Sequence, residues 1–459
     1  MPAHNRILTR ACSKLPILVL DSLRKGSMGI TLDEKHQLLL EESQQILKKL
    51  KKLEELDVYF DASENAPAEV NMQRKLASIR SSVQEIQSFW LPDVLRACDL
   101  YHYSPKTSGK EDSFKIPLEF LAMLHEAAGL AYKDRDFQLG IELLDFSCHI
   151  FFHSRFDING EERAKDEELA TAEFLYTQIG IEMEDYDFAY EHIKKAMQQY
   201  LDQRSDFRVE VRYREREWML RGCMAEALDG KGSHKEAERY YREALSLRPL
   251  HNKYSRYEVG LGRCLLLQGK STEAKKQLAS FLLELERAPG AVSRTRNHWI
   301  GLTLYWLGNA HDGDDGATAF EFYFRAFESL RLSLGEADPM FGAASYKLGE
   351  HHYTQAVTES SDVKFHADAA LLYFRTALEV FHSGHSSEYR KADRARALYK
   401  IGCTYEVLRG LDEAKRAEYS QAADQALDKA FDLQKEIIST RNLDLNEIIH
   451  DQLVSRWSR

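Results

Sequence analysis

The stretch Arg214–Pro249, REREWMLRGCMAEALDGKGSHKEAERYYREALSLRP, decides the fold of this chain. In its second half Ala237, Tyr241 and Ala244 follow one another at intervals of four and three residues, which places them on one stripe of a helix. Small residues on such a stripe let another helix approach closely, and the tyrosine fills the space between the two. Pro249 ends the helix. The stretch therefore predicts two helices packed as a hairpin.

The same spacing, with the second and third residues four and seven positions after the first, recurs along the chain. It occurs six times, which is hard to attribute to chance, at Gly140/Leu144/Ser147, Ala189/Ile193/Ala196, Ala237/Tyr241/Ala244, Ala274/Leu278/Phe281, Ala319/Tyr323/Ala326 and Ala370/Phe374/Ala377. A seventh occurrence is less regular, because either Ala414 or Ala423 could open it. The spacing predicts a series of six to seven helical hairpins.

The first helix of most units carries a matching Leu-Gly or Ile-Gly pair, at Leu261-Gly262, Leu307-Gly308, Leu348-Gly349 and Ile401-Gly402. Trp218 and Gly222 stand on the first helix of the stretch quoted above. Together these residues resemble the tetratricopeptide repeat, in which Trp, Leu-Gly and Tyr precede Ala, Phe, Ala and Pro over about 34 residues. The resemblance implies an all-α fold, a right-handed α-solenoid of helical hairpins.

Three units depart from this pattern. The third has three extra residues around Gly230-Lys231-Gly232, and the sixth carries an insertion at Thr358–Lys364. The second has Thr177 where the glycine is expected. The fifth unit ends in Leu334–Pro339, LGEADP, which resembles the longer repeats, of about 42 residues, of kinesin light chains. These departures concern helix packing within units and leave the predicted architecture unchanged.

The chain divides into four predicted parts. Residues 1–30 read as a poorly ordered N-terminal segment, and 31–112 as a helical hairpin that opens with a capping sequence at Thr31–Glu34. This hairpin either caps the solenoid or mediates self-association. Residues 113–440 form the solenoid, and 441–459 a C-terminal tail.

Composition limits the classes of partner. The 459 residues carry a net charge of -11, with 73 acidic and 62 basic side chains, which disfavours nucleic acid and favours a protein partner. No run approaches the ~18 apolar residues of a membrane span. The six cysteines form no C-x-x-C pair, as in reduced cytoplasmic or nuclear proteins. The alternative of organelle import, suggested by Arg6, Arg10 and Lys14, is disfavoured because Pro2 and Pro16 interrupt a helix there.

The chain shows no catalytic constellation. Gly269-Lys270-Ser271-Thr272 resembles the end of a phosphate-binding loop, but Cys264 stands where the motif needs glycine, and a turn between repeat helices explains Gly269. His149 and His153 lie one helical turn apart without a third metal ligand, and the pair His351-His352 is a weaker candidate. We therefore expect no enzyme activity, cofactor or metal.

The resemblance also implies where a partner binds. In this family the second, fifth, ninth and twelfth positions of each unit point into a concave groove. Counted from the aligned glycines, with Gly222 taken as the glycine of the third unit, these positions yield the candidate partner-binding residues Arg216, Arg256, Arg263, Tyr305, Asn309, Tyr346, Tyr353, Arg396 and Tyr399. Three arginines in neighbouring units and four tyrosines suit an acidic or phosphorylated peptide with apolar anchors.

Two simpler interpretations stay open for these side chains. Arg216 and Arg256 could pair with Glu215, Glu217 or Glu258 on solvated faces, and the tyrosines could be packing residues. The chaperone-binding members need two asparagines in the groove, and only Asn309 is available. We expect a non-enzymatic scaffold that binds a peptide or helix of a partner protein. The alternative is a ligand-responsive regulatory subunit of an enzyme or transcription factor.

Overall fold

A computed structural model describes residues 115–116, 118–133, 137–153, 155–156, 162–202, 210–249, 255–288, 294–333, 339–358, 362–382 and 390–441. Within these residues the chain forms fourteen helices and two strands of two residues each. The predicted N-terminal segment, the predicted hairpin at 31–112 and the tail beyond Arg441 lie outside the described residues. The helices group into two compact units, residues 1–182 with 188–208 and residues 183–187 with 209–459.

The first unit contains α5 (Leu118–Lys133), α6 (Phe137–His153), α7 (Glu162–Glu182) and α8 (Tyr186–Asp202). Helices α5 and α6 pack together, and both contact α7. Strands β1 (Lys115–Ile116) and β2 (Arg155–Phe156) pair in parallel, with Lys115 opposite Arg155. The sequence did not predict this short ladder.

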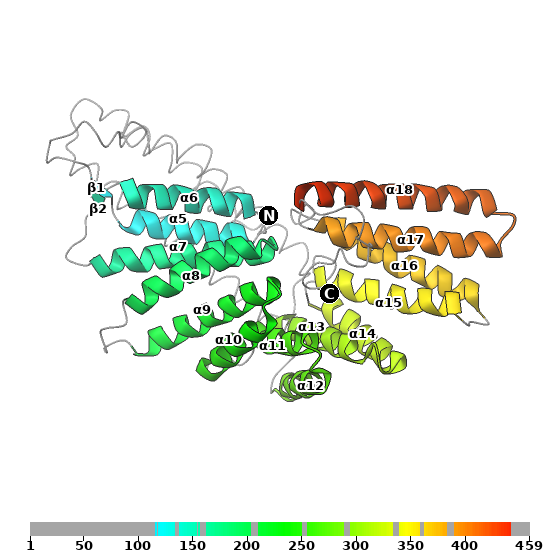
Figure 1. Cartoon of the computed structure of the whole chain (residues 1–459), viewed down its shortest axis with the longest axis horizontal. Coiled ribbons are helices and arrows are strands. Elements are labelled where there is room, and N and C mark those ends of the chain that lie inside the picture. The colour runs from blue at the N-terminus through cyan, green and yellow to red at the C-terminus, as the bar shows by residue number, and fades with distance from the viewer. Residues whose placement is uncertain are drawn as a thin grey trace, which may run out of the picture. The chain divides into compact units, whose positions relative to one another are not determined.

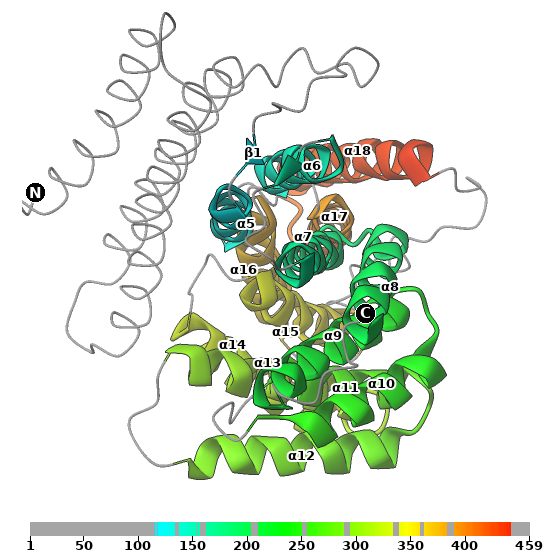
Figure 2. The same cartoon turned by 90° about the vertical axis from the view of Figure 1, so that its left-hand side faces the viewer.

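The second unit is a continuous series of hairpins. Its helices are α9 (Glu210–Gly230), α10 (His234–Leu247), α11 (Arg256–Leu267), α12 (Ser271–Arg287), α13 (Arg294–His311), α14 (Gly316–Arg331), α15 (Pro339–Thr358), α16 (Val363–His382), α17 (Lys391–Leu411) and α18 (Arg416–Arg441). Each helix packs on the next in the chain, α11 also contacts α9 and α13, and α15 also contacts α17 (Figure 1, Figure 2). The predicted all-α solenoid of helical hairpins is confirmed.

The small, large, small stripes form the contact between the two helices of a hairpin. All six predicted triplets are buried. In the units whose first helix carries the glycine, the large residue lies against it, and a Cβ placed on Gly308 would come within 2.5 Å of Tyr323. Gly349 stands in the same relation to Phe374, at 2.7 Å. The Leu-Gly signature is therefore a packing requirement, because any side chain at the glycine would overlap the ring.

The third unit has no insertion, which corrects the sequence prediction. Gly232 and Gly269 have φ angles of 82° and 75°, so both turn the chain in a conformation that favours glycine. Each glycine is the middle residue of a three-residue turn and stands five residues before the first alanine of its stripe. Ala225, which is buried, therefore occupies the glycine position of this unit, and Gly222 packs instead against Tyr257 of α11. The groove positions of the third unit shift by three residues.

The last two hairpins are longer than a standard repeat. Helix α15 extends through Thr358 and α16 begins at Val363, so both ends of the predicted insertion, Thr358 and Val363–Lys364, are helical. In the seventh unit Gly402 faces Leu427, and Ala423 and Ala430 are buried. Ala414 is exposed in the turn before α18. Ala423 therefore opens the seventh stripe, and the alternative based on Ala414 is wrong.

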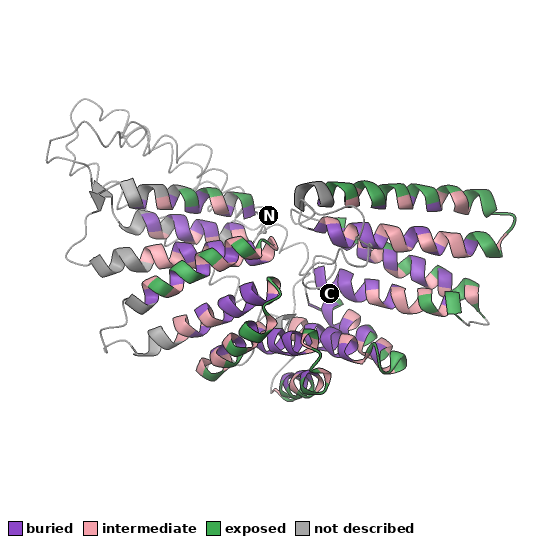
Figure 3. Ribbon diagram, viewed as in Figure 1, coloured by how far each residue is buried: buried purple, intermediate pink, exposed green. Residues whose placement is uncertain are grey.

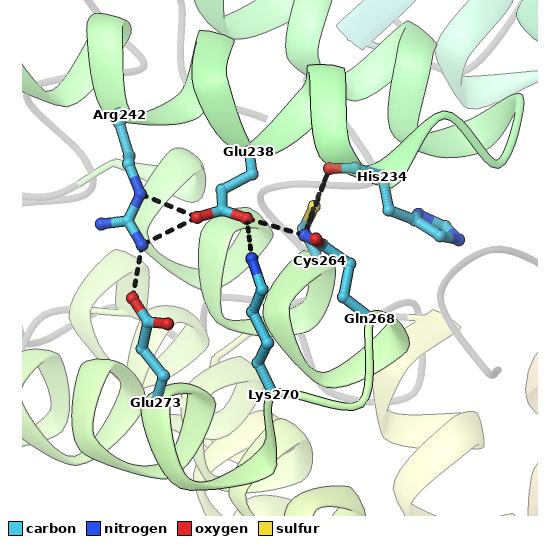
Figure 4. A network of polar contacts seen from close by, with 7 residues as sticks. All are labelled: His234, Glu238, Arg242, Cys264, Gln268, Lys270 and Glu273. Atoms are coloured by element: carbon cyan, nitrogen blue, oxygen red, sulfur yellow. Dashed lines mark hydrogen bonds and ion pairs between the residues drawn. The ribbon is translucent and has the colours of Figure 1, made fainter.

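A polar network joins α10 to the turn between α11 and α12 (Figure 4). The Glu238 carboxylate accepts hydrogen bonds from Lys270 Nζ at 2.6 Å, Gln268 Nε2 at 2.9 Å and Arg242 Nε at 3.0 Å. Arg242 also contacts Glu273 at the start of α12. Burial raises the pKa of Glu238, but the three donors outweigh it and lower this pKa to about 2. The network holds α10 against the next unit of the solenoid.

Candidate partner-binding face

The first helices of the second unit, α9, α11, α13, α15 and α17, present the candidate site. Their middle members are covered on most sides, because each contacts its own second helix, a neighbouring second helix and another first helix (Figure 3). In α11 every residue from Tyr257 to Leu265 is buried. We call the side chains at the corrected groove positions the first-helix face. They are Met219, Gly222, Glu226, Asp229, Arg256, Val259, Arg263, Leu266, Leu302, Tyr305, Asn309, Asp312, Ala343, Tyr346, Glu350, Tyr353, Arg396, Tyr399, Cys403 and Glu406.

Two carboxylates of α9 neutralise two of the predicted arginines. Arg256 Nη2 lies 2.8 Å from Glu226 Oε2, and Arg263 pairs with Asp229. The side chains of Glu226 and Asp229 are buried, as is Arg263, which is 2% exposed. Such a pair is held because either charge alone would be costly away from water. Arg256 and Arg263 therefore form part of the contact between α9 and α11 and offer little net positive charge to a partner.

The sequence prediction missed Asp229 because of the register of the third unit, and it did not foresee that Glu226 pairs with Arg256. Counting from Gly222 placed Arg216 on the face and left Asp229 off it. The observed register puts Glu226 and Asp229 at the ninth and twelfth positions, next to α11. Glu258, named as a possible partner of Arg256, pairs with Arg248 instead. Arg216 itself is partly exposed.

A second set of charges connects α13, α15 and α17. Lys347 Nζ lies 3.2 Å from Asp312 and 3.4 Å from Glu350, and Lys400 Nζ lies 3.7 Å from Glu350. Lys400 also stands over the ring of Tyr353, 5.4 Å from its centroid. Burial lowers the pKa of Lys347, but its acidic neighbours and Tyr305 outweigh it and raise this pKa above the usual value. Opposite charges thus alternate across the face.

The expected row of four exposed tyrosines is reduced to two. Tyr305 and Tyr346 are only 1% and 3% exposed. Their rings pack against Tyr323 at 5.9 Å and Phe374 at 5.3 Å, between first and second helices. Burial raises the pKa of Tyr305, as expected for a core phenol. Tyr353 and Tyr399 are partly exposed and remain on the surface of the face.

Arg396 is also drawn into the protein. Its guanidinium stacks on the ring of Tyr346, 4.3 Å from the centroid, and the residue is buried. Of the nine predicted residues, the structure thus buries Arg263, Tyr305, Tyr346 and Arg396. The other five, Arg216, Arg256, Asn309, Tyr353 and Tyr399, stay partly accessible.

Asn309 has a fixed orientation on α13. Its Oδ1 accepts a hydrogen bond from the Tyr323 hydroxyl at 2.7 Å. The Tyr323 hydroxyl also lies 3.3 Å from Asp312 Oδ2, so the phenol is anchored on both sides. Within the described part of the chain the Asn309 Nδ2 group has no hydrogen-bond acceptor, although the atom is covered. The amide therefore holds two N–H donors that have no acceptor among the described residues.

No helix among the described residues combines the length and apolar character that a membrane crossing requires. The predicted turn at Gly269 is confirmed, since Gly269 joins α11 to α12 with a positive φ angle, and the segment before it is a helix. The chain thus has a helical hairpin where a phosphate-binding loop would need a strand.

No family model matches the sequence, and no curated protein matches it. Several solved structures are similar in fold. The Rap protein complexed with Competence and Sporulation Factor has a TM-score of 0.46 and 13% identity, over 90% of this chain and 100% of that one. Cut9 in the APC/C hetero-tetramer Cut9–Hcn1 has a TM-score of 0.34 and 11% identity, over 99% and 95%. The human IFIT1 dimer with PPP-AAAA has a TM-score of 0.33 and 12% identity, over 91% and 94%.

These similarities are too distant to carry a function across, because no TM-score among them reaches 0.5. The description of this chain as a tetratricopeptide-like helical repeat rests on its own packing. The recurrent stripe, the glycine beneath the large side chain of the fourth to seventh units and the order of the hairpins are the observations that carry it.

Proposed function

We propose that this chain is a non-enzymatic scaffold whose first-helix face binds a peptide segment or helix of a partner protein. The accessible apolar side chains on this face are Met219, Leu266, Tyr353 and Tyr399. Tyrosine provides broad contact area at a low cost in conformational entropy. These residues are the anchors of the proposed interface, and the paired charges between them set its register.

The observation that carries the proposal is the amide of Asn309. Its oxygen is engaged by Tyr323, while Nδ2 has no acceptor among the described residues. A covered polar group without a hydrogen bond costs about 1–3 kcal/mol. A backbone carbonyl of a bound peptide would recover this energy, once the side chains that cover Nδ2 move aside. An extended segment or the end of a helix supplies such carbonyl groups.

The ion pairs change the kind of partner that we propose. A free arginine cluster would select acidic or phosphorylated residues, but Arg256 and Arg263 are already paired with Glu226 and Asp229. We therefore propose a partner that contacts the face through apolar side chains and backbone carbonyls. Binding of this kind depends only weakly on salt, because few exposed charges change their partners.

The test compares partner capture from a native cell extract by variants of the face. We expect Tyr353→Ala/Tyr399→Ala to lose the captured partners because the aromatic anchors are removed. Asn309→Asp keeps the oxygen that Tyr323 needs but replaces the donor with an acceptor, and we expect the same loss. The matched control is Leu283→Ala, which removes an exposed apolar side chain from second helix α12.

The outcome is read together with helical circular dichroism of each variant. Loss in both face variants and retention in Leu283→Ala supports the proposal. Retention of the same partners by all three variants contradicts it and moves the interface away from the first helices.

A further inference from the structure

Two histidines from different helices face each other across the sixth hairpin. His352 lies on α15 and His366 on α16, and their Nδ1 atoms are 3.0 Å apart. Both residues are partly exposed. The side chains come together because α15 and α16 are antiparallel neighbours joined by a short connection.

Aromatic side chains surround the pair and fix the His352 ring. Tyr373 stacks on it with ring centroids 5.7 Å apart and planes 9° apart. Phe320 of α14 and Phe365 of α16 approach the same ring at 5.7 Å and 6.3 Å. Packing of this kind restricts the imidazole to a narrow range of orientations, which is what a ligand of defined geometry requires.

The distance between the two nitrogens matches shared coordination. Two imidazoles bound to one divalent ion with bonds of about 2.0–2.1 Å have their nitrogens roughly 2.9–3.3 Å apart, depending on the bond angle. A direct hydrogen bond would also give this distance, with one Nδ1 protonated and the other acting as acceptor. The two arrangements differ in their use of the nitrogen lone pairs. A metal ion binds the Nδ1 lone pair of both rings, whereas a hydrogen bond uses the lone pair of only one.

Burial, together with the neighbouring imidazoles of His351 and His366, disfavours a proton on the His352 ring and lowers its pKa to about 4.

From this geometry we propose that His352 and His366 bind one divalent transition-metal ion, such as Zn²⁺ or Cu²⁺, across the α15–α16 hairpin. Imidazole nitrogen suits both ions, and water completes the coordination. The bound ion links two helices, so it stabilises the hairpin by an amount that grows with the ion concentration. The sequence did not predict this site, because residue spacing in this hairpin pointed only to the adjacent pair His351-His352. His366 follows the predicted insertion, so its approach to His352 could not be inferred from spacing.

A second group of side chains that could bind a metal ion lies in the same unit and serves as a comparison. Ligand atoms of Asp229, His234 and Cys264 come within 4.8 Å of one another. Asp229 is already engaged, because it pairs with Arg263 and accepts a hydrogen bond from His234 Nδ1 at 2.8 Å. Burial raises the pKa of the Cys264 thiol to about 12, so the thiolate is disfavoured. This group therefore has neither a free carboxylate nor a ready thiolate to offer.

The test is calorimetric titration of the full chain with Zn²⁺, and separately with Cu²⁺, under reducing conditions for Zn²⁺. We expect wild type to bind one equivalent that His352→Gln and His366→Gln bind about tenfold more weakly or worse. Glutamine keeps the size and hydrogen-bonding capacity of the side chain while removing the imidazole. The matched controls are His382→Gln, on an exposed histidine at the end of α16, and Cys264→Ser in the competing group.

A second measurement separates binding from a general effect on folding. Zn²⁺ should raise the unfolding temperature of wild type and of both controls but not of His352→Gln or His366→Gln. For Cu²⁺, the electron paramagnetic resonance spectrum of wild type should show coupling to two nitrogens. The proposal is overturned if wild type binds no ion, if binding is unchanged in both glutamine variants, or if Cys264→Ser alone abolishes it.

Discussion

At the scale of single residues, glycines that look alike in the sequence have different roles. A Cβ on Gly402 would lie 2.7 Å from Leu427 and 3.3 Å from the carbonyl oxygen of Ala423. Gly410, eight residues later on the same helix, has nothing within 4 Å of its Cβ position. The first glycine therefore allows α17 and α18 to approach, and the second is only a weak point in the helix.

Alanine substitution at these two glycines should have opposite effects. We expect Gly402→Ala to lower the free energy of unfolding by about 1–3 kcal/mol, because the added methyl overpacks the helix contact. Gly410→Ala should raise the free energy of unfolding by up to about 1 kcal/mol through its better helix propensity. Urea unfolding followed by circular dichroism measures both. A Gly402→Ala variant as stable as Gly410→Ala would contradict the packing requirement.

At the scale of elements, contacts between consecutive hairpins decide which side chains remain available. Arg256 and Arg263 of α11 are held by α9, and Arg396 of α17 is stacked on α15. On the opposite side of the same hairpins, Glu238 fixes α10 to the α11–α12 turn. Polar side chains at the junctions between units therefore serve mainly to hold one hairpin to the next.

The Glu238 network should make this junction sensitive to acid. The pKa of Glu238 in the folded protein, about 2, is below the ordinary value of 4.5, so the ionised carboxylate favours folding. Its contribution is fully present above pH 4.5 and is lost as the pH falls toward 2. We therefore expect Glu238→Gln to be less stable than wild type at pH 6, with the difference shrinking by pH 3. Urea midpoints at the two pH values measure the effect.

The control for this prediction is Glu273→Gln. Glu273 contacts only Arg242 of the network and is half exposed, so its substitution should have a smaller effect. A wild-type advantage over Glu238→Gln that stays constant from pH 6 to pH 3 would show that the charge of Glu238 is not what matters.

At the scale of the whole molecule, the second unit has overlapping cores without a single centre. One core joins residues of α11 to α16 around Trp306, and the next joins α15 to α18 around Phe374. In such an arrangement each hairpin depends mainly on its neighbours, so stability is distributed along the chain. Both cores include residues of α15 and α16, the helices that carry the proposed metal site.

Loss of the Trp306 side chain should therefore act regionally. Trp306 is fully buried on α13, and Trp306→Ala should cost about 3–5 kcal/mol in its own core. We expect hydrogen exchange of backbone amides to increase most in α11 to α14 and much less in α17 and α18. Equal loss of protection in all helices of the second unit would mean that the unit unfolds as one cooperative body.

The repeat architecture of the second unit could be predicted from residue spacing alone. The stripe that begins at Ala237 and the glycines beneath the large residues of the later units are local features, and a solenoid needs only contacts between neighbouring hairpins. The register of the third unit could be misread because Ala225 stands where the repeat normally has glycine. Gly222, three residues earlier, imitates the pattern. The choice between Ala414 and Ala423 likewise required the packing of Leu427 on Gly402.

The accessibility of the residues of the first-helix face could be learned only from the packing of the helices. Tyr305 lies in the core and Tyr353 stays accessible because neighbouring helices cover the first helices to different extents. The pairing of Arg263 with Asp229 and the approach of His352 to His366 join residues of different helices. Local spacing specifies each helix and the helix with which it forms a hairpin. Which charges and metal ligands meet depends on the register between helices, and the residues of one stripe do not contain that information.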